Sequence, residues 1–425
     1  MTSHPLITTL KNLEGNPKAA VYTEPLWGIP YHLFIPYASV YMLALGITDA
    51  QIGLIASLGM VAQTIFALLS GAITDKYGRR LTTFVFDLLG WSIPMIIWAV
   101  AQDIRYFIAA AIFNAMWRIP ANSWVCQLVE DAPEDQLVHI WTWIFIAGML
   151  SAYFAPLAGL LIEAYDLIPA VRMLYLFGAG LMTFKGWVLY RYSTETRQGV
   201  IRREETRGQP LLSLLRGYGS VLRQLLRTPR TLLVIGIMLV MTIIALVNGI
   251  FWSIIVTERL GVQAEHLALY PFARSVLMLV LYFVLVPRLN LRRFRNPMLI
   301  GFVGLGLSTL LLVTIPPENF LLLLLSVLLE AFSMALYSPL MESLVVVSVA
   351  AQERARINAI MAVVVIVLAS PFGWIAGQLS TIDRTLPFLL NLVLLGIGMI
   401  LVWLAGHNAG RRTGAETTPE AAGLD

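Results

Sequence analysis

Long runs of apolar residues alternate with short polar or Gly- and Pro-containing breaks along almost the whole chain. Crossing a hydrocarbon core of about 30 Å takes roughly 20 helical residues, so each long run is a candidate membrane span. Barrel strands would be about ten residues long with alternating polarity, and these runs do not alternate. The pattern therefore predicts twelve transmembrane α-helices, at residues 27–46, 50–73, 81–101, 105–129, 137–163, 168–192, 231–257, 265–287, 297–315, 319–345, 356–379 and 385–405.

The longest polar interruption, residues 193–230, divides these spans six and six. It predicts an all-α membrane protein of two pseudo-symmetric six-helix bundles, at residues 27–192 and 231–405. Residues 1–26 form an N-terminal segment and residues 406–425 a tail, both expected in the cytoplasm. The second part of the linker favours an amphipathic helix on the inner leaflet over a plain basic tether, because leucines oppose arginines at helical spacing. These are Leu211, Leu214, Leu215, Leu222, Leu225 and Leu226, against Arg216, Arg223 and Arg227.

Composition excludes a soluble globule, since 58% of the residues are hydrophobic, 13% are charged and the mean hydropathy is +0.77. Most of the 29 Lys and Arg residues fall on one side of the predicted membrane when the N-terminus is placed inside. Cytoplasmic loops carry this excess, so both termini are expected to face the cytosol at the cell membrane. The net charge of +4 then reflects membrane topology, and no nucleic-acid partner is expected.

The charged segment between the second and third spans carries the most specific motif. Its pattern is Gly71, three residues, Asp75, two residues, Gly78, Arg79 and Arg80. This resembles the loop between the second and third helices of the major facilitator superfamily, and all five key positions match. The resemblance implies the twelve-helix fold of that family, alternating access between two half-transporters, and a substrate site between the halves.

Asp75 and Arg79 lie one helical turn apart and are able to form an ion pair. In the family such a pair joins an acid at the inner end of the fourth helix, and Glu130 occupies the matching position here. The resemblance therefore implies a gating latch in the cytoplasmic loop that holds the outward-facing state. A positively charged loop that only sets topology is the alternative.

Ionisable residues inside spans form the second informative set, because a charge exposed to lipid costs at least about 2.5 kcal/mol. Asp87 and Lys185 lie close enough to the cytosol to snorkel or to pair locally. Arg118, Arg274 and Glu330 lie near the middle of spans that line the central cavity in the family. A structural ion pair between Arg274 and Glu330 is the alternative. The residues expected to line the cavity are Arg118, Arg274, Glu330, Asn114, Asn122, Asn248, Trp252, Tyr31, His32 and Tyr337.

These residues predict a secondary transporter of a small organic solute, coupled to protons through Glu330, with efflux of drug-like compounds as one direction. Two mid-membrane arginines also admit an organic anion, so an uptake or exchange carrier for organic anions or sugars stays open. The fifth-span signature of drug exporters is only half present at residues 155–160, which weakens export. A sensor or an intramembrane enzyme on the same fold is the remaining alternative.

Other chemistry finds little support in the residue types. The five histidines are scattered without metal-ligand spacing, and no phosphate-binding Gly-rich loop occurs. We therefore expect no enzymatic activity, no metal and no cofactor, with the substrate, protons and the lipid bilayer as partners of a monomer. Cys126, the single cysteine, is expected to serve packing.

Overall fold

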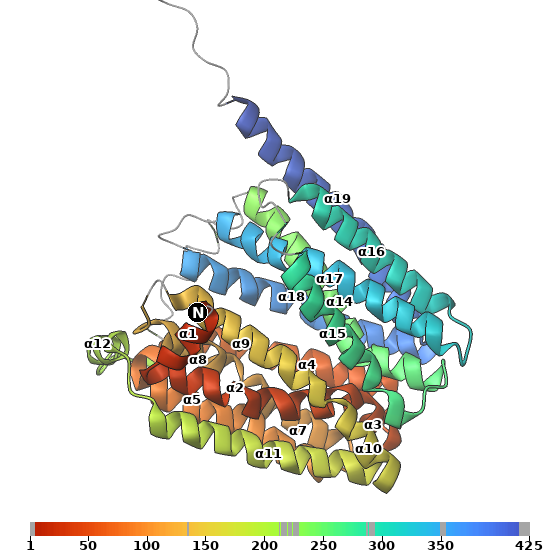
Figure 1. Cartoon of the computed structure of the whole chain (residues 1–425), viewed down its shortest axis with the longest axis horizontal. Coiled ribbons are helices and arrows are strands. Elements are labelled where there is room, and N and C mark those ends of the chain that lie inside the picture. The colour runs from red at the N-terminus through yellow and green to blue at the C-terminus, as the bar shows by residue number, and fades with distance from the viewer. Residues whose placement is uncertain are drawn as a thin grey trace, which may run out of the picture.

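In a computed structural model of the chain, helices are the only regular secondary structure over the residues that it describes (Figure 1). These are residues 5–133, 136–211, 229–285, 294–348 and 354–415, with positions 213, 219, 223 and 288. The first half contains α1 (Pro5–Asn12), α2 (Gly15–Phe34), η1 (Ile35–Tyr37), α3 (Ala38–Ala44), α4 (Asp49–Tyr77), α5 (Arg79–Asp87), η2 (Leu88–Ser92), α6 (Ile93–Ala99), α7 (Ile104–Ala115), α8 (Arg118–Val129), α9 (Leu137–Ser151), η4 (Ala152–Phe154), α10 (Pro156–Tyr165) and α11 (Leu167–Tyr192). The linker and second half contain α12 (Arg197–Glu205), α14 (Pro229–Glu258), η6 (Ala264–His266), α15 (Leu269–Val284), α16 (Arg295–Thr314), α17 (Phe320–Ser348), α18 (Arg354–Ile382) and α19 (Leu386–Ala415).

Ten helical segments among the described residues are long and apolar enough to cross a membrane. The two other predicted spans are present as broken helices, α2–η1–α3 and α7–α8. The break between α7 and α8 has a local cause, because Pro120 lacks an N–H and its ring clashes with the carbonyl group four residues earlier. That carbonyl belongs to Met116, which instead accepts a tighter bond of 2.9 Å from the Ile119 N–H.

The two halves form adjacent layers, coloured red to yellow-green and green to blue in Figure 1. The N-terminus, α1 and α12 lie at one end of the bundle, which we call the amino-terminal end, and α3 and α10 lie at the opposite end. Helices α4 and α18 form the closest packing between the halves. Near the opposite end Gly53 faces Gly373 and Gly377 so closely that a methyl group on Gly53 would meet the Gly373 carbonyl oxygen at 2.3 Å. Glycine at these positions is what allows the two backbones to touch.

The helix of the first predicted span begins at Gly15, ahead of the predicted start at residue 27. Pro17, Pro25 and Pro30 do not stop it, because a membrane helix tolerates the loss of single backbone bonds when neighbouring helices pack around it. Its early turns are buried in a separate apolar cluster at the amino-terminal end. That cluster contains Leu13, Ala19, Ala20, Val21, Leu128, Ile140 and Leu189.

The charged segment after the second span is mostly helical, where the resemblance implied a loop. Helix α4 continues past Gly71 to Tyr77, since no residue between them breaks a helix. Gly78 alone makes the turn, with φ of 88°, and α5 begins at the next residue. The interfacial helix predicted within residues 211–227 lies outside the described residues, apart from positions 211, 213, 219 and 223.

Candidate functional site

A cavity of about 510 Å³ lies inside the first half, and half of the 16 residues that line it are aromatic. Six of the 11 tryptophans of the chain line it, together with one tyrosine and one phenylalanine. This volume falls in the range of pockets that hold drug-sized molecules. The lining comprises Glu24, Trp27, Tyr31, Phe34, Ile35, Asp87, Trp91, Trp98, Asn114, Trp117, Pro120, Ala121, Trp124, Val125, Trp141 and Lys185.

Helical spacing explains how so many side chains reach one cavity. Three spans each contribute a stripe whose members lie three or four residues apart, or a multiple of that spacing, so they share one helix face. The stripes are Glu24, Trp27, Tyr31 and Phe34 on α2; Asp87, Trp91 and Trp98 on the third span; and Asn114, Trp117, Ala121 and Trp124 on the fourth.

Two backbone irregularities position the central tryptophans. Trp91 lies in η2, a π-helical turn that precedes Pro94, and such turns often occur at functional sites. Trp117 lies at the break between α7 and α8. The two irregular segments contact each other through Gly90, where a methyl group would meet the Trp117 backbone nitrogen at 2.8 Å. Asn114 Nδ2 donates to the Gly90 carbonyl oxygen at 2.8 Å and fixes this approach.

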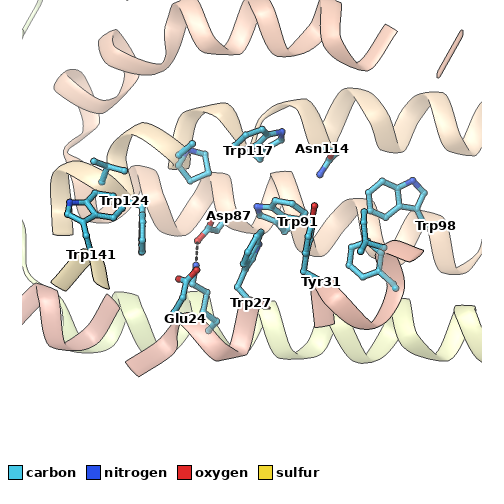
Figure 2. Close-up of a pocket in the computed structure, with 16 residues that line it drawn as sticks. Glu24, Trp27, Tyr31, Asp87, Trp91, Trp98, Asn114, Trp117, Trp124 and Trp141 are labelled. Carbon is cyan, nitrogen blue, oxygen red and sulfur yellow. Dashed lines mark ion pairs between the residues drawn. The ribbon is translucent and has the colours of Figure 1, made fainter. Parts of the chain in front are cut away.

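The aromatic rings contact one another as well as the cavity (Figure 2). Trp27 stacks on Tyr31 with ring centroids 4.8 Å apart, and Trp91 meets Trp27 edge-on at 5.4 Å. Trp124 and Trp141 form a second edge-on pair at 6.3 Å. Such pairs are each worth about 0.5–1.5 kcal/mol beyond burial of their area, so the wall is a rigid surface.

Three ionisable side chains from three spans meet in the cavity. Lys185 Nζ on α11 lies 3.5 Å from Asp87 Oδ2, and these side chains are only 8% and 12% exposed. Glu24 lies beside Asp87 in Figure 2 and interacts electrostatically with both Asp87 and Lys185. The lining therefore holds two carboxylates and one ammonium group. We call Glu24, Asp87 and Lys185 the acidic cluster.

Tyr31 and Asn114 are the predicted cavity residues that line this cavity. Arg118 is not among the lining residues; its Nε donates to Gln63 Oε1 at 2.9 Å and its guanidinium lies 4.2 Å from the centre of the Trp117 ring. Asn122 donates to the Thr74 hydroxyl at 3.3 Å. His32 meets the Tyr31 ring edge-on at 5.5 Å, outside the lining.

The predicted residues of the second half lie in other contacts. Arg274 Nη1 is 3.6 Å from Glu330 Oε1, and Arg274 also interacts electrostatically with Tyr31 and His32 across the two halves. Asn248, Trp252 and Tyr337 each contact another residue of the second half. The role of all five residues in substrate binding stays a prediction. Asn391 Nδ2 donates to Asn248 at 2.9 Å, Trp252 meets the Tyr270 ring at 6.1 Å, and Tyr337 meets the Phe302 ring at 5.6 Å.

At the amino-terminal end, Arg79 joins both acids that the sequence predicted. Its guanidinium lies 3.1 Å from Asp75 and 3.0 Å from Glu130, and its side chain is 4% exposed. Arg80 donates to the Tyr190 carbonyl oxygen at 2.7 Å. All these contacts lie within the first half, and their role in gating stays a prediction.

Glu195 completes this charged group, and the sequence pattern did not single it out. Its carboxylate accepts the backbone N–H groups of Arg79 at 2.7 Å and Arg80 at 3.2 Å, which caps the start of α5. A methyl group on Gly78 would meet the Glu195 carboxylate at 2.4 Å, which is a second reason for glycine there. The linker is thereby attached to the motif of the second and third spans.

Polar contacts join the two halves at the opposite end. Asp49 Oδ2 accepts a hydrogen bond of 2.6 Å from the Ser380 hydroxyl and lies 3.5 Å from Arg384 Nε. The Ser57 hydroxyl accepts the Trp374 backbone N–H at 2.7 Å. Both hydrogen bonds join α4 to α18 near the Gly53 contact, so the described residues show the halves held together at this end.

Sequence reasoning missed Glu24 and the tryptophan wall, and it set Asp87 and Lys185 apart from the cavity that they line. Glu24 lies in the segment 1–26 that is expected to be cytoplasmic, because the predicted first span begins at residue 27. The spacing of Glu24, Trp27 and Tyr31 was the available signal, since one polar and two aromatic residues on one helix face favour a cavity over lipid. Among the described residues, no three His, Cys, Asp or Glu side chains are grouped to hold a metal ion.

Comparison with known proteins identifies the architecture. The family model described as Major Facilitator Superfamily matches residues 28–363. A POT family transporter in complex with 5-aminolevulinic acid superposes with a TM-score of 0.71 at 13% identity, over 95% of this chain and 99% of that one. The nucleoside transporter NupG gives 0.68 at 14%, over 92% and 98% of the chains, and the human organic anion transporter MFSD10 (TETRAN) gives 0.63 at 15%, over 94% and 100%. No curated protein matches the sequence.

Proposed function

Because this chain belongs to the major facilitator superfamily and is a multi-pass secondary transporter of a small solute, we propose that it exchanges an organic solute for protons. The family is non-enzymatic, so the alternative of an intramembrane enzyme is dropped. The proposed direction is efflux of a drug-like compound from the cytoplasm. The proposed setting is the plasma membrane, with both termini cytoplasmic and the protein a monomer.

The observation that carries the proposal is the acidic cluster inside the aromatic cavity. Burying a charge is costly unless it is paired, and here the lining holds two carboxylates but one ammonium group, which lies within ion-pair distance of Asp87 alone. Moreover, Asp87 Oδ2 is buried and makes no hydrogen bond of good geometry, since its contact with Lys185 is a long one. A proton or a bound solute would each relieve the excess charge. Competition between them at one site is the simplest route to exchange.

Contacts at the ends of the bundle support alternating access. The two halves are joined near Gly53 at the opposite end. At the amino-terminal end, the contacts of Arg79 with Asp75, Glu130 and Glu195, which we call the Arg79 clasp, involve only first-half residues and the linker. Parallel six-helix repeats alternate access by rocking about a site between them. We infer that the Arg79 clasp stabilises the first half as a rigid body, and that its contacts with the second half form in the other state.

Proteoliposomes with an imposed pH gradient test the proposal. The panel of solutes contains drugs, sugars and organic anions, and each is measured with and without the gradient. We expect proton-driven flux of at least one solute in the wild type and its loss in Asp87→Asn. Asp103→Asn is the matched control, because Asp103 is 39% exposed, lies outside the cavity and pairs with Arg105. Full proton-driven flux in Asp87→Asn would remove the acidic cluster from the coupling mechanism.

A further inference from the structure

We propose that the cavity of the first half selects a flat organic cation with a single positive charge. The inference rests on the proposed function and names its substrate class. It is based on the charges of the lining residues and on the arrangement of the rings beside them.

The charges of the lining favour a cation. Asp87 is paired with Lys185, whereas the Glu24 carboxylate makes no hydrogen bond and no ion pair within 4 Å to any described residue. The ionised lining thus has one negative charge without a close partner. A monocation would compensate it, and an anion would have to approach two carboxylates.

The nearby arginines are not among the lining residues. Arg118 donates its Nε to the neutral Gln63 side chain, and its guanidinium lies 4.2 Å from the centre of the Trp117 ring. Arg274 is paired with Glu330 at 3.6 Å. The organic-anion substrate considered for these two arginines therefore has no free guanidinium in this cavity to bind it.

The rings next to Glu24 favour a flat molecule. Trp27 and Tyr31, on the same helix face as Glu24, stack at an interplanar angle of 16° and form a nearly continuous apolar surface. Trp91 stands edge-on to both rings, at 5.4 and 6.1 Å, and closes one side. A flat aromatic ligand can stack in this corner while its charge faces the carboxylate.

The cavity already holds one cation against a tryptophan. Lys185 Nζ lies 5.9 Å from the centre of the Trp124 ring, within the range of a cation–π interaction. The Trp124 Nε1–H is buried and has no hydrogen-bond partner among the described residues. Cations delocalised over a ring system suit such a wall, because their low hydration reduces the cost of entering it.

Three probes of similar shape and different charge test whether the cavity selects its ligand by charge. Quinoline is neutral at about pH 8, N-methylquinolinium has nearly the same shape with a permanent charge, and quinoline-2-carboxylate adds a negative charge. Binding to the purified full-length protein in detergent is measured by calorimetry and by quenching of tryptophan fluorescence. We expect the cation to bind about tenfold more tightly than quinoline, and the carboxylate to bind more weakly than both.

Variants of Glu24 test whether its carboxylate produces the preference for the cation over quinoline. Glu24→Gln should bring the affinities for cation and quinoline within about twofold of each other, and Glu24→Asp should restore part of the preference. Glu163→Gln is the matched control, because Glu163 is exposed on α10 of the same half and lies outside the cavity. Thermal melting confirms that each variant is folded. Lowering the pH should weaken binding of the cation more than that of quinoline, since protons compete for the carboxylate.

Equal affinities for the cation and quinoline in the wild type would overturn the inference, as would a preference that survives in Glu24→Gln. Failure of the proposed function gives a different result. If a neutral or anionic solute shows proton-driven flux while the cation does not bind, the substrate class is wrong and proton exchange stands. If the cation binds with the expected selectivity but the proteoliposomes show no proton-driven flux, cation recognition stands and proton exchange is wrong.

Discussion

Replacing Gly53 by alanine tests whether the contact between α4 and α18 stabilises the conformation in which the two halves touch at the opposite end. The added methyl group would lie 2.3 Å from the Gly373 carbonyl oxygen and 2.8 Å from the Gly377 Cα atom. These are backbone atoms, so no side chain can rotate away. The two helices must move apart by at least about 0.7 Å to bring the shortest contact from 2.3 to 3.0 Å.

Overpacking of this kind costs about 1–3 kcal/mol. The cost applies to the state in which the halves touch at the opposite end, and it is absent where alternating access separates them. Because 1.4 kcal/mol corresponds to a factor of ten in an equilibrium, we expect Gly53→Ala to shift the ratio of open to closed states at that end by about 5- to 140-fold toward the open state. The Ser57 and Asp49 contacts with α18 are expected to weaken together with it, since they lie on the same helix.

Distances between spin labels on the two halves measure this shift. Tyr165 and Ile382 are suitable label sites at the opposite end, because they are 56% and 77% exposed, and Cys126 is first replaced by alanine. Gly59→Ala is the matched control on the same helix, where the new methyl group would meet Ala111 at an ordinary 3.6 Å. Both variants gain the same helix propensity, so their difference isolates the clash.

The reasoning is refuted if Gly53→Ala and Gly59→Ala give the same distance distribution as the unsubstituted background. It is supported if a longer distance gains population only in Gly53→Ala. Melting measurements on both variants check that the change is a shift between folded states.

Three further predictions concern ion pairs and caps away from the cavity. Glu195→Ala should lower the free energy of unfolding by about 1 kcal/mol, because it uncaps the first turn of α5; thermal melting checks this, and Glu195→Gln should retain most of the stability. Arg384→Gln removes the charged partner of Asp49, leaving the Ser380 hydrogen bond, and should favour opening at the opposite end, which the same spin labels would detect; an unchanged distribution would exclude it as a gate residue. Glu330→Gln should abolish proton-driven accumulation and leave solute–solute exchange intact, and a variant that still concentrates solute against a gradient would exclude Glu330 from coupling.

The membrane class, the two halves and the family followed from one-dimensional features of the chain. The lengths of the apolar runs indicate the number of transmembrane helices, because a helix must be about 20 residues long to cross the bilayer, wherever its neighbours lie. The Gly71 to Arg80 motif was readable because its residues are close together in the chain, although the Asp75–Arg79 ion pair crosses the Gly78 turn between α4 and α5. Even there the glycines differ, because only Gly78 adopts a positive φ and Gly71 lies within α4.

The cavity was decided by the tertiary structure. Glu24, Asp87 and Lys185 are separated by about sixty to one hundred residues of chain, and only the rotation of α2, the third span and α11 brings them together. That rotation depends on packing between helices, on the π-turn around Trp91 and on the break beside Trp117. In lipid an apolar face and a cavity-facing aromatic face have the same composition, so hydropathy assigned these helices to the membrane without indicating which side faces the solute.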